Sequence, residues 1–374
     1  LVERFCVSGD LELDFWQSTH PVEGIRAHQR IQRSRPQEYE SEVPVAHEVL
    51  RDGISIHVQG RIDVVHRLPD HVIIEEIKTT RRDDISFQSL ENPRHWAQVK
   101  LYTYIYAVLH SPPIVETQLT YFHLPSGKTF EARRSFEMSE LEEFFNSLID
   151  QFLNQERAIQ DWSRLRNETI ASLDFPFPSY RPGQRQMAVE VYRAIRDQEH
   201  LLVQAPTGIG KTLAAIFPAL KAMGEASTKK ILYLAARTTG KSVAQKALEQ
   251  LRGEGLRLRS IVLTAKDKIC FNPEKGCNAE ECAYARGYYD RVGKAIEELL
   301  KLELLNRESI EAAAQKHTIC PFELSLNLTT ATDCIICDYN YAFDPRAILR
   351  QLLYEQEFRP TLIVDEAHNL VDRA

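Results

Sequence analysis

Ala205-Pro-Thr-Gly-Ile-Gly-Lys-Thr212 is the segment that decides the fold of the second half of this chain. The apolar run Leu201–Gln204 before it predicts a short strand, and the pattern of Leu213–Met223 after it predicts a helix. A glycine-rich loop between a strand and a helix points its backbone N–H groups at phosphates. We therefore expect an ATP-binding loop, in which Ala205 stands where a glycine is usual.

Four residues of this loop are expected to bind the phosphates or the Mg²⁺ of ATP. Gly208 and Gly210 let the backbone bend so that its N–H groups reach the phosphates. Lys211 supplies a positive charge to the β- and γ-phosphates, and the Thr212 hydroxyl can ligate Mg²⁺. The loop therefore implies ATP and Mg²⁺ as ligands of this half of the chain.

A matching segment, Leu362-Ile-Val-Asp-Glu-Ala-His368, lies near the C-terminus. Its three apolar residues predict a buried strand, and Asp365 and Glu366 follow at the C-terminal end of the strand, where ligands bind in open α/β sheets. We expect Asp365 to hold Mg²⁺, commonly through water, and Glu366 to polarise the attacking water. This pair of acids opposes the alternative that the glycine-rich loop belongs to a P-loop kinase.

Helices alternate with short apolar strands throughout the second half, which predicts a parallel sheet with helices on both faces. The stretch from about 266 to 327 interrupts the alternation and contains four cysteines. The expected strands are Leu201–Gln204, Ile231–Ala235, Ser260–Thr264, Cys334–Cys337 and Thr361–Val364.

Cys270, Cys277, Cys282 and Cys320 are separated by 6, 4 and 37 residues. Four thiolates suit either a [4Fe–4S] cluster or zinc, and the spacing alone leaves both open. A further pair, Cys334 and Cys337, falls within an expected buried strand, where residues three apart point to opposite faces. We interpret this pair as part of the core.

The second half resembles the XPD/DinG family of superfamily 2 DNA helicases over about residues 175–374. Besides the DEAH box at 365–368, the resemblance rests on Ile269-Cys-Phe-Asn-Pro273, Ile319-Cys-Pro-Phe-Glu-Leu324 and Asp338-Tyr-Asn-Tyr-Ala-Phe343. It implies a RecA-like motor domain that carries a [4Fe–4S] insertion ligated by the four cysteines at 270, 277, 282 and 320. It also implies that Gln184 contacts adenine and that Arg237 faces the DNA backbone, with a plain surface cation as the alternative for Arg237.

The proline-rich segment 174–183 marks a domain boundary, because three prolines and a glycine cannot lie inside a regular element. We place the boundary near residue 170, which gives domains 1–170 and 171–374. The first domain is predicted to be mixed α/β. Its expected strands are Ile54–His57, Val72–Lys78 and Thr117–His123, and its expected helices are Val22–Gln32, Trp96–Leu109 and Ser139–Asn154.

Asp63, Glu76 and Lys78 form a candidate site in this first domain. Glu76 and Lys78 are two apart in a predicted strand and share a face. An Asp and a Glu can bind Mg²⁺ or Mn²⁺, which lowers the pKa of a water, and a lysine can position that water or stabilise charge at a phosphate. A Glu-x-Lys pair alone is weak evidence, because surface strands often carry both residues.

Three further residues strengthen the pattern, because His28 precedes it on a predicted helix and Gln98 and Tyr102 follow on one face of another. The order His, Asp, Glu-x-Lys, Gln-x-x-x-Tyr resembles the RecB-like branch of the PD-(D/E)XK nucleases, which have a restriction-endonuclease-like fold. The resemblance implies that His28, Asp63 and Glu76 bind metal, that Lys78 is catalytic, and that Gln98 and Tyr102 shape the DNA-facing side. A degenerate domain that only docks DNA is the alternative.

The composition limits the classes of protein to which the chain can belong. The net charge is -7, from 46 basic and 53 acidic residues, so the chain as a whole is not a basic nucleic-acid binder, although a local groove can still be basic. No apolar run is long enough for a membrane span, and no signal peptide is visible, so we expect a cytoplasmic protein (nucleoid-associated if bacterial). DNA, single-stranded by preference, is the expected partner; the sequence does not give an oligomeric state.

The resemblance also predicts a longer protein. Superfamily 2 motors need a second RecA-like domain, and this chain stops six residues after His368. We therefore expect the chain by itself to bind ATP weakly and not to unwind DNA. Together these interpretations predict an ATP-dependent DNA helicase coupled to a metal-dependent DNA nuclease that acts in DNA repair or processing.

Overall fold

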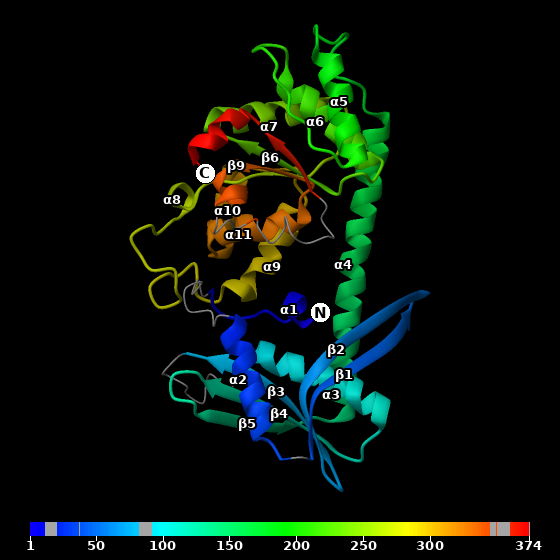
Figure 1. The fold of residues 1–374 in the computed structure, drawn as a ribbon, viewed down its shortest axis with the longest axis vertical. Coiled ribbons are helices and arrows are strands. Elements are labelled where there is room, and N and C mark those ends of the chain that lie inside the picture. The colour runs from blue at the N-terminus through cyan, green and yellow to red at the C-terminus, as the bar shows by residue number, and fades with distance from the viewer. Residues whose placement is uncertain (12–20, 37, 82–91, 345–348, 350–359, 374) are drawn as a thin grey trace. The chain divides into compact units, whose positions relative to one another are not determined.

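The computed structural model describes residues 1–11, 21–36, 38–81, 92–344, 349 and 360–373 (Figure 1). The chain divides into two compact units, Leu1–Glu156 and Arg157–Ala374. The division falls inside one long helix, whereas the sequence analysis placed a boundary near residue 170. Within the described residues, no helix is both long enough and apolar enough to cross a membrane.

The first unit contains a five-stranded mixed sheet in the order β1-β2-β3-β4-β5. β3 and β4 run parallel, and the other neighbouring strands run antiparallel. The mixed α/β architecture agrees with the expectation from the sequence. The strands are β1 (Tyr39–Arg51), β2 (Ile54–Arg67), β3 (Val72–Thr80), β4 (Val115–His123) and β5 (Thr129–Ser135).

β1 and β2 form a long hairpin of which the sequence analysis predicted only a four-residue part. Asp52 and Gly53 make the turn, both with positive φ, which matches the right-handed twist of the paired strands. A second irregularity lies in β1 at Glu42, whose φ is +58°. The ladder pairs Ser41 with Val64 and Val43 with Ile62, so Glu42 and Asp63 oppose each other without pairing. The ladder keeps the same register on both sides of this gap, so no residue is inserted there.

Helices cover this sheet: α1 (Val2–Phe5), α2 (Pro21–Ser34), α3 (Pro93–His110) and the first half of α4 (Met138–Ser172). Asn92 is the N-cap residue of α3, and its side chain accepts the backbone N–H of Arg94 at 3.0 Å. Pro93 occupies the first helical position. Its buried residues join those of β2, β3 and β4 in the main core of the unit. Ala27 and Ile31 fix α2 over a smaller core.

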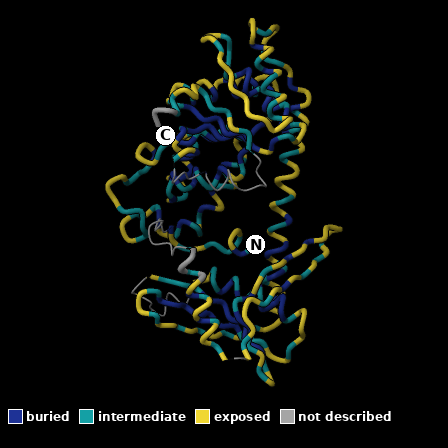
Figure 2. The backbone as a smooth tube through the Cα atoms, viewed as in Figure 1, coloured by how far each residue is buried: buried dark blue, intermediate teal, exposed yellow. Residues whose placement is uncertain are grey.

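The second unit contains an all-parallel five-stranded sheet in the order β10-β6-β9-β7-β8, which confirms the predicted parallel sheet. Figure 2 shows its strands as largely buried. Its strands are β6 (Lys230–Ala235), β7 (Ser260–Val262), β8 (Leu304–Leu305), β9 (Cys334–Asp338) and β10 (Pro360–Val364).

One expected strand is absent from this sheet. Leu201–Gln204 is irregular and exposed, with Leu202 94% exposed, so the prediction of a strand there was wrong. A four-residue apolar run is compatible with a strand, but a strand forms only where a ladder partner is available. β8, which the sequence analysis did not predict, is the fifth strand instead.

Helices of the second unit pack around its sheet, and α6 starts directly at Lys211. The second half of α4 also belongs here, because Ile170 and Leu173 are buried in the same core as β6 and β9. The stretch between β7 and β9 holds α8 to α11 together with β8. The helices are α5 (Gln184–Asp197), α6 (Lys211–Gly224), α7 (Thr238–Gly253), α8 (Lys266–Ile269), α9 (Tyr288–Leu299), α10 (Arg307–His317), α11 (Pro321–Leu328), the 3₁₀ turn η2 (Thr329–Ala331), α12 (Asn340–Phe343) and the 3₁₀ turn η3 (Ala367–Arg373).

Candidate functional site

Asp63 links three elements of the first unit. One carboxylate oxygen lies 3.5 Å from Nδ1 of His28 on α2, and the other accepts the backbone N–H of Ile77 in β3 at 2.7 Å. The His28 side chain is 29% exposed and that of Asp63 is 15% exposed. Two residues that are 35 positions apart in the sequence therefore meet with access to solvent.

Glu76 and Lys78 project from β3 toward α3. The Lys78 ammonium donates to Glu76 Oε1 at 2.7 Å and to Gln98 Oε1 at 2.8 Å. Tyr102, one turn after Gln98, also bonds to the Gln98 side chain. Its ring packs against Gly60, where an added Cβ would lie 2.6 Å from Tyr102 Cε1. A side chain at position 60 would therefore displace the tyrosine.

Burial controls the charge at this site. It raises the pKa of Glu76 to about 7, against the opposing effect of the Lys78 ammonium, and the nearby charge of Asp63 raises it further. The hydrogen bond to Asp63 raises the pKa of His28. Glu76 is 3% exposed, and its Oε2 is buried without a hydrogen-bond partner. A buried carboxylate oxygen without a partner is costly unless a cation or a donor reaches it.

The donor set of His28, Asp63 and Glu76 fits a divalent cation in its chemistry, since carboxylate oxygens are the ligands that Mg²⁺ prefers. The free Glu76 Oε2 is the observation that supports this fit. Within the described parts of the chain, no three or more His, Cys, Asp or Glu side chains are gathered as a metal-binding group. Here Lys78 is bonded to one oxygen of Glu76, and His28 and Asp63 form a separate pair.

The sequence analysis missed two residues beside this site. His95 lies one turn before Gln98 on α3, and its Nδ1 is 2.5 Å from the Tyr121 hydroxyl. Tyr121 pairs with Lys78 in the β3–β4 ladder. Burial, followed by the charge of Lys78, lowers the pKa of His95 to about 3. In the sequence, only the spacing of three residues between His95 and Gln98 indicated that His95 shares a helix face with the site.

Gln184 braces the glycine-rich loop at 205–212 of the second unit. The Gln184 side chain is buried, donates to the Gly210 carbonyl at 3.3 Å and accepts the backbone N–H of Arg181 at 3.0 Å. Gly208 and Gly210 have φ of +86° and +81°, a region that favours glycine. An added Cβ at Gly210 would lie 2.4 Å from Gln184 Nε2, so a side chain there would also displace the Gln184 amide. Arg181, which the sequence analysis did not assign, donates to the Gly208 carbonyl.

The glycine-rich loop at 205–212 and the acids that follow β10 lie close together. The Lys211 ammonium lies 3.4 Å from Glu366 Oε1, and the Thr212 hydroxyl lies 3.5 Å from the Tyr233 hydroxyl. Asp365 follows β10, and its Oδ2 would be 3.3 Å from a Cβ added at Gly240.

Arg237 precedes α7 as its N-cap residue, and it is exposed at the C-terminal end of β6. That placement is compatible with both the DNA-facing interpretation and the surface-cation interpretation.

Four cysteines of the second unit are free and half-buried: Cys270, Cys277, Cys282 and Cys320. Lys266 donates a hydrogen bond to Cys277, and its pKa is raised further by the proximity of Cys320 and Cys270. Burial raises the pKa of Cys320 to about 11. A shared cation neighbour, Lys266, places three of these thiols in one region. Their chemistry suits a cluster or zinc, although among the described residues they are not gathered as a metal-binding group.

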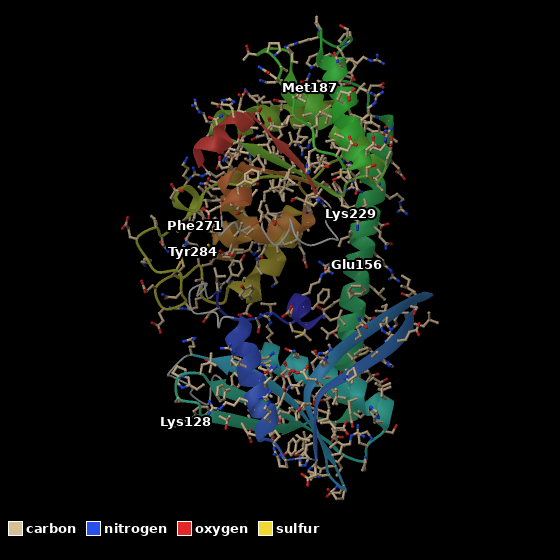
Figure 3. The ribbon with its side chains drawn as sticks, in the orientation of Figure 1. Lys128, Glu156, Met187, Lys229, Phe271 and Tyr284 are labelled. Carbon is tan, nitrogen blue, oxygen red and sulfur yellow. The ribbon has the colours of Figure 1, made fainter. Side chains whose placement is uncertain are left out.

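Aromatic packing supports this cysteine-bearing loop. The rings of Phe271 and Tyr284 lie with their centroids 5.0 Å apart and connect the stretch after Cys270 to the stretch after Cys282 (Figure 3). Cys334 and Cys337, by contrast, are fully buried in β9. They are core residues, as the sequence analysis expected.

Three family models match the chain. Residues 13–182 match the PD-(D/E)XK nuclease superfamily, residues 181–270 match the DEAD/DEAH box helicase family, and residues 241–374 match the DEAD_2 family. The order of these matches agrees with the order of the two compact units.

Curated relatives match about half of this chain. "Regulator of telomere elongation helicase 1" of Homo sapiens is 25% identical over 253 residues, which are 53% of this chain and 20% of that protein. The homologue of Anopheles gambiae is 26% identical over 53% of this chain and 25% of that protein. The chain thus matches a fifth to a quarter of the length of these relatives.

Two solved structures, "XPD_Helicase" and "Truncated XPD", are each 22% identical to this chain. They cover 52% and 49% of this chain and 34% and 52% of their own, with TM-scores of 0.37 and 0.34. Because both scores are below 0.5, the fold of each unit is assigned from its own strand order and from the family matches.

Proposed function

Because this chain joins a domain of the PD-(D/E)XK nuclease superfamily to a DEAD/DEAD_2 helicase region, we propose that it serves an ATP-dependent DNA helicase coupled to a metal-dependent DNA nuclease. The observation that carries the nuclease part is the buried, unpartnered Oε2 of Glu76 beside Lys78 and close to Asp63. The observation that carries the motor part is the contact between Lys211 and Glu366.

In the nuclease unit, His28, Asp63 and Glu76 would hold Mg²⁺ or Mn²⁺. The bound ion lowers the pKa of a water molecule and offsets charge on a phosphodiester. Lys78, held at 2.8 Å by Gln98, orients the attacking water or stabilises charge on the phosphate. Burial keeps part of the Glu76 population protonated near pH 7 in the absence of the ion, so metal binding releases a proton there.

In the motor unit, Gly208, Gly210 and Lys211 would bind the phosphates of ATP, and Thr212 and Asp365 would bind its Mg²⁺. Glu366 would polarise the attacking water, and Gln184 would contact adenine. Gln184 already bonds to the phosphate-binding loop, so adenine binding at Gln184 is coupled to the shape of that loop.

The four cysteines at 270, 277, 282 and 320 would hold a [4Fe–4S] cluster, with zinc as the alternative. This assignment is supported by their half-buried, unpaired thiols and by the position of Lys266 near three of them. We propose single-stranded DNA as the substrate, with Gln98 and Tyr102 on the DNA-facing side of the nuclease site and Arg237 on that of the motor. The process served is DNA repair or processing.

A second candidate function is a DNA-docking domain attached to an ATPase, in which the nuclease fold does not cut. The docking function is favoured because no three His, Cys, Asp or Glu side chains among the described residues are gathered so that they could hold a metal ion. The two candidates differ in what Lys78→Ala does. If the unit is a nuclease, this variant keeps Mn²⁺ and DNA binding but cleaves linear and circular single strands at least about 100-fold more slowly than wild type. If wild-type protein binds DNA but cuts neither substrate with Mg²⁺ or Mn²⁺, the docking function is correct.

A further inference from the structure

Gln32 on α2 reaches the same strand residue as His28. Its side-chain amide donates to the backbone carbonyl of Asp63 at 3.2 Å and to Glu42 Oε1 at 2.8 Å. His28 and Gln32 are one helical turn apart, so they lie on one face of α2. One of them contacts the Asp63 carboxylate, and the other contacts the Asp63 backbone.

Glu42 occupies an unusual backbone position opposite Asp63. It has a φ of +58° without being glycine, and it lies where the β1–β2 ladder omits a pair. Its second carboxylate oxygen is 3.3 Å from the guanidinium of Arg61. Residues with this φ are strained unless their surroundings hold them, and the amide of Gln32 is such a restraint. The gap in the ladder lies at Glu42 and Asp63, and the Gln32 amide bonds to the Asp63 backbone carbonyl at this gap.

We propose that Gln32 and Glu42 are positioning residues that set the distance between His28 and Asp63 and thereby the metal affinity of the site. The inference rests on the proposed nuclease function. Without the Gln32 amide, α2 keeps its apolar contacts through Ala27 and Ile31. It loses its bond to the strand beside Asp63, so the imidazole and carboxylate are no longer held at a fixed separation. Residues that orient metal ligands typically change metal affinity by 10-fold or more.

The test uses the whole 374-residue chain without nucleotide, with Mn²⁺ alone as the probe. Bound Mn²⁺ is measured by electron paramagnetic resonance, and binding that Asp63→Ala abolishes is assigned to this site. Gln32→Ala should weaken that binding about 10-fold, whereas Gln29→Ala, an exposed glutamine on the same helix, should leave it unchanged. At saturating Mn²⁺, the cleavage rate of Gln32→Ala should return to within about twofold of wild type, because the variant retains every group that touches the substrate.

Glu42→Asn provides the second variant. Asparagine tolerates this φ better than glutamate but is too short to bond Gln32 in the same way, so the fold is kept and Mn²⁺ binding should still weaken. Unchanged Mn²⁺ affinity in both Gln32→Ala and Glu42→Asn would overturn this inference and leave the nuclease proposal standing. Wild-type protein that binds no more Mn²⁺ than Asp63→Ala would overturn both.

Discussion

His95 shows how one buried side chain ties the stability of the nuclease unit to pH. Its pKa in the folded chain is about 3, well below its usual value of 6.5, because burial and the charge of Lys78 oppose protonation. The unfolded chain therefore binds a proton at this residue more readily than the folded chain. The contribution of His95 to stability is present above pH 6.5 and is lost as the pH falls from 6.5 toward 3.

This reasoning predicts the behaviour of His95→Gln. Its midpoint of thermal unfolding should fall less than that of wild type when the pH is lowered from 7.5 to 5, because glutamine takes up no proton. His57→Gln, which replaces an exposed histidine of β2, should follow the wild-type profile. Parallel profiles for wild type and His95→Gln would show that His95 is protonated in the folded chain.

At the nucleotide site, two single changes separate binding from hydrolysis. In the ATP-hydrolysing protein, Lys211→Ala should weaken ATP binding because a positive charge near the phosphates is lost, while Glu366→Gln should bind ATP and hydrolyse it at least about 100-fold more slowly. Steady-state phosphate release and equilibrium binding of labelled ATP distinguish the two variants. Wild-type hydrolysis by either one would mean that the motor assignment is wrong.

At the scale of elements, α4 is anchored to the motor unit by one buried acid. Asp333, 6% exposed, accepts hydrogen bonds from Arg166 Nη1 at 2.6 Å and from Trp162 Nε1 at 2.9 Å, both on α4. It also accepts the backbone N–H of Arg259 at 2.9 Å, and the Arg259 guanidinium lies 3.9 Å from the Trp162 ring centroid. The second half of α4 is thus part of the motor core.

Asp333→Ala should therefore destabilise the motor unit by about 3–5 kcal/mol, because it leaves the Arg166 charge buried without its partner. Denaturant unfolding measures the change. Asp161→Ala, which removes an exposed pair with Arg164 on the same helix, should cost less than about 1 kcal/mol. Equal effects of the two substitutions would mean that α4 is not anchored through Asp333.

The cysteine-bearing stretch gives a prediction of its own. Cys270→Ser or Cys320→Ser should abolish the brown colour and the iron content, about four atoms per chain, of anaerobically prepared protein. Cys334→Ser should keep both, because that thiol is buried in β9. Stoichiometric zinc in place of iron would replace the cluster assignment with a zinc site.

Sequence reasoning predicted the elements whose pattern is determined locally. β6, β9 and β10 are mainly apolar runs, and β3 combines apolar and β-branched residues with the Glu-x-Lys pair; all four were predicted within one or two residues. β1 was missed because it is mostly exposed and contains Pro44, so its pattern resembles that of a loop. Leu201–Gln204 was predicted as a strand because apolar character alone does not supply a ladder partner.

In the candidate sites too, contiguous motifs were predicted and residues with distant partners were missed. The phosphate-binding loop and the acids after β10 are contiguous motifs, so the sequence identifies them, although the roles of their residues remain predictions. Gln32, His95 and Tyr121 were missed because each acquires its partner only when a helix docks on the nuclease sheet. The contact between Gln32 on α2 and Asp63 on β2 produces no sequence pattern within either segment, so it could not be predicted.

At the scale of the whole molecule, the account claims two chemically independent sites on one chain. Every proposed nuclease ligand lies within the unit Leu1–Glu156, and every proposed ATP-binding residue lies within Arg157–Ala374. Metal-assisted phosphodiester cleavage needs no nucleotide. A substitution in one site should therefore leave the chemistry of the other intact.

The most direct test is the cleavage of end-labelled and circular single-stranded DNA by the 374-residue chain with Mn²⁺ and without ATP. Wild type, Asp63→Ala and Lys211→Ala are compared at equal concentration. The account predicts that wild type and Lys211→Ala cut at the same rate and that Asp63→Ala does not cut. Cleavage by Asp63→Ala at the wild-type rate, or no cleavage by wild type with either DNA, would contradict it.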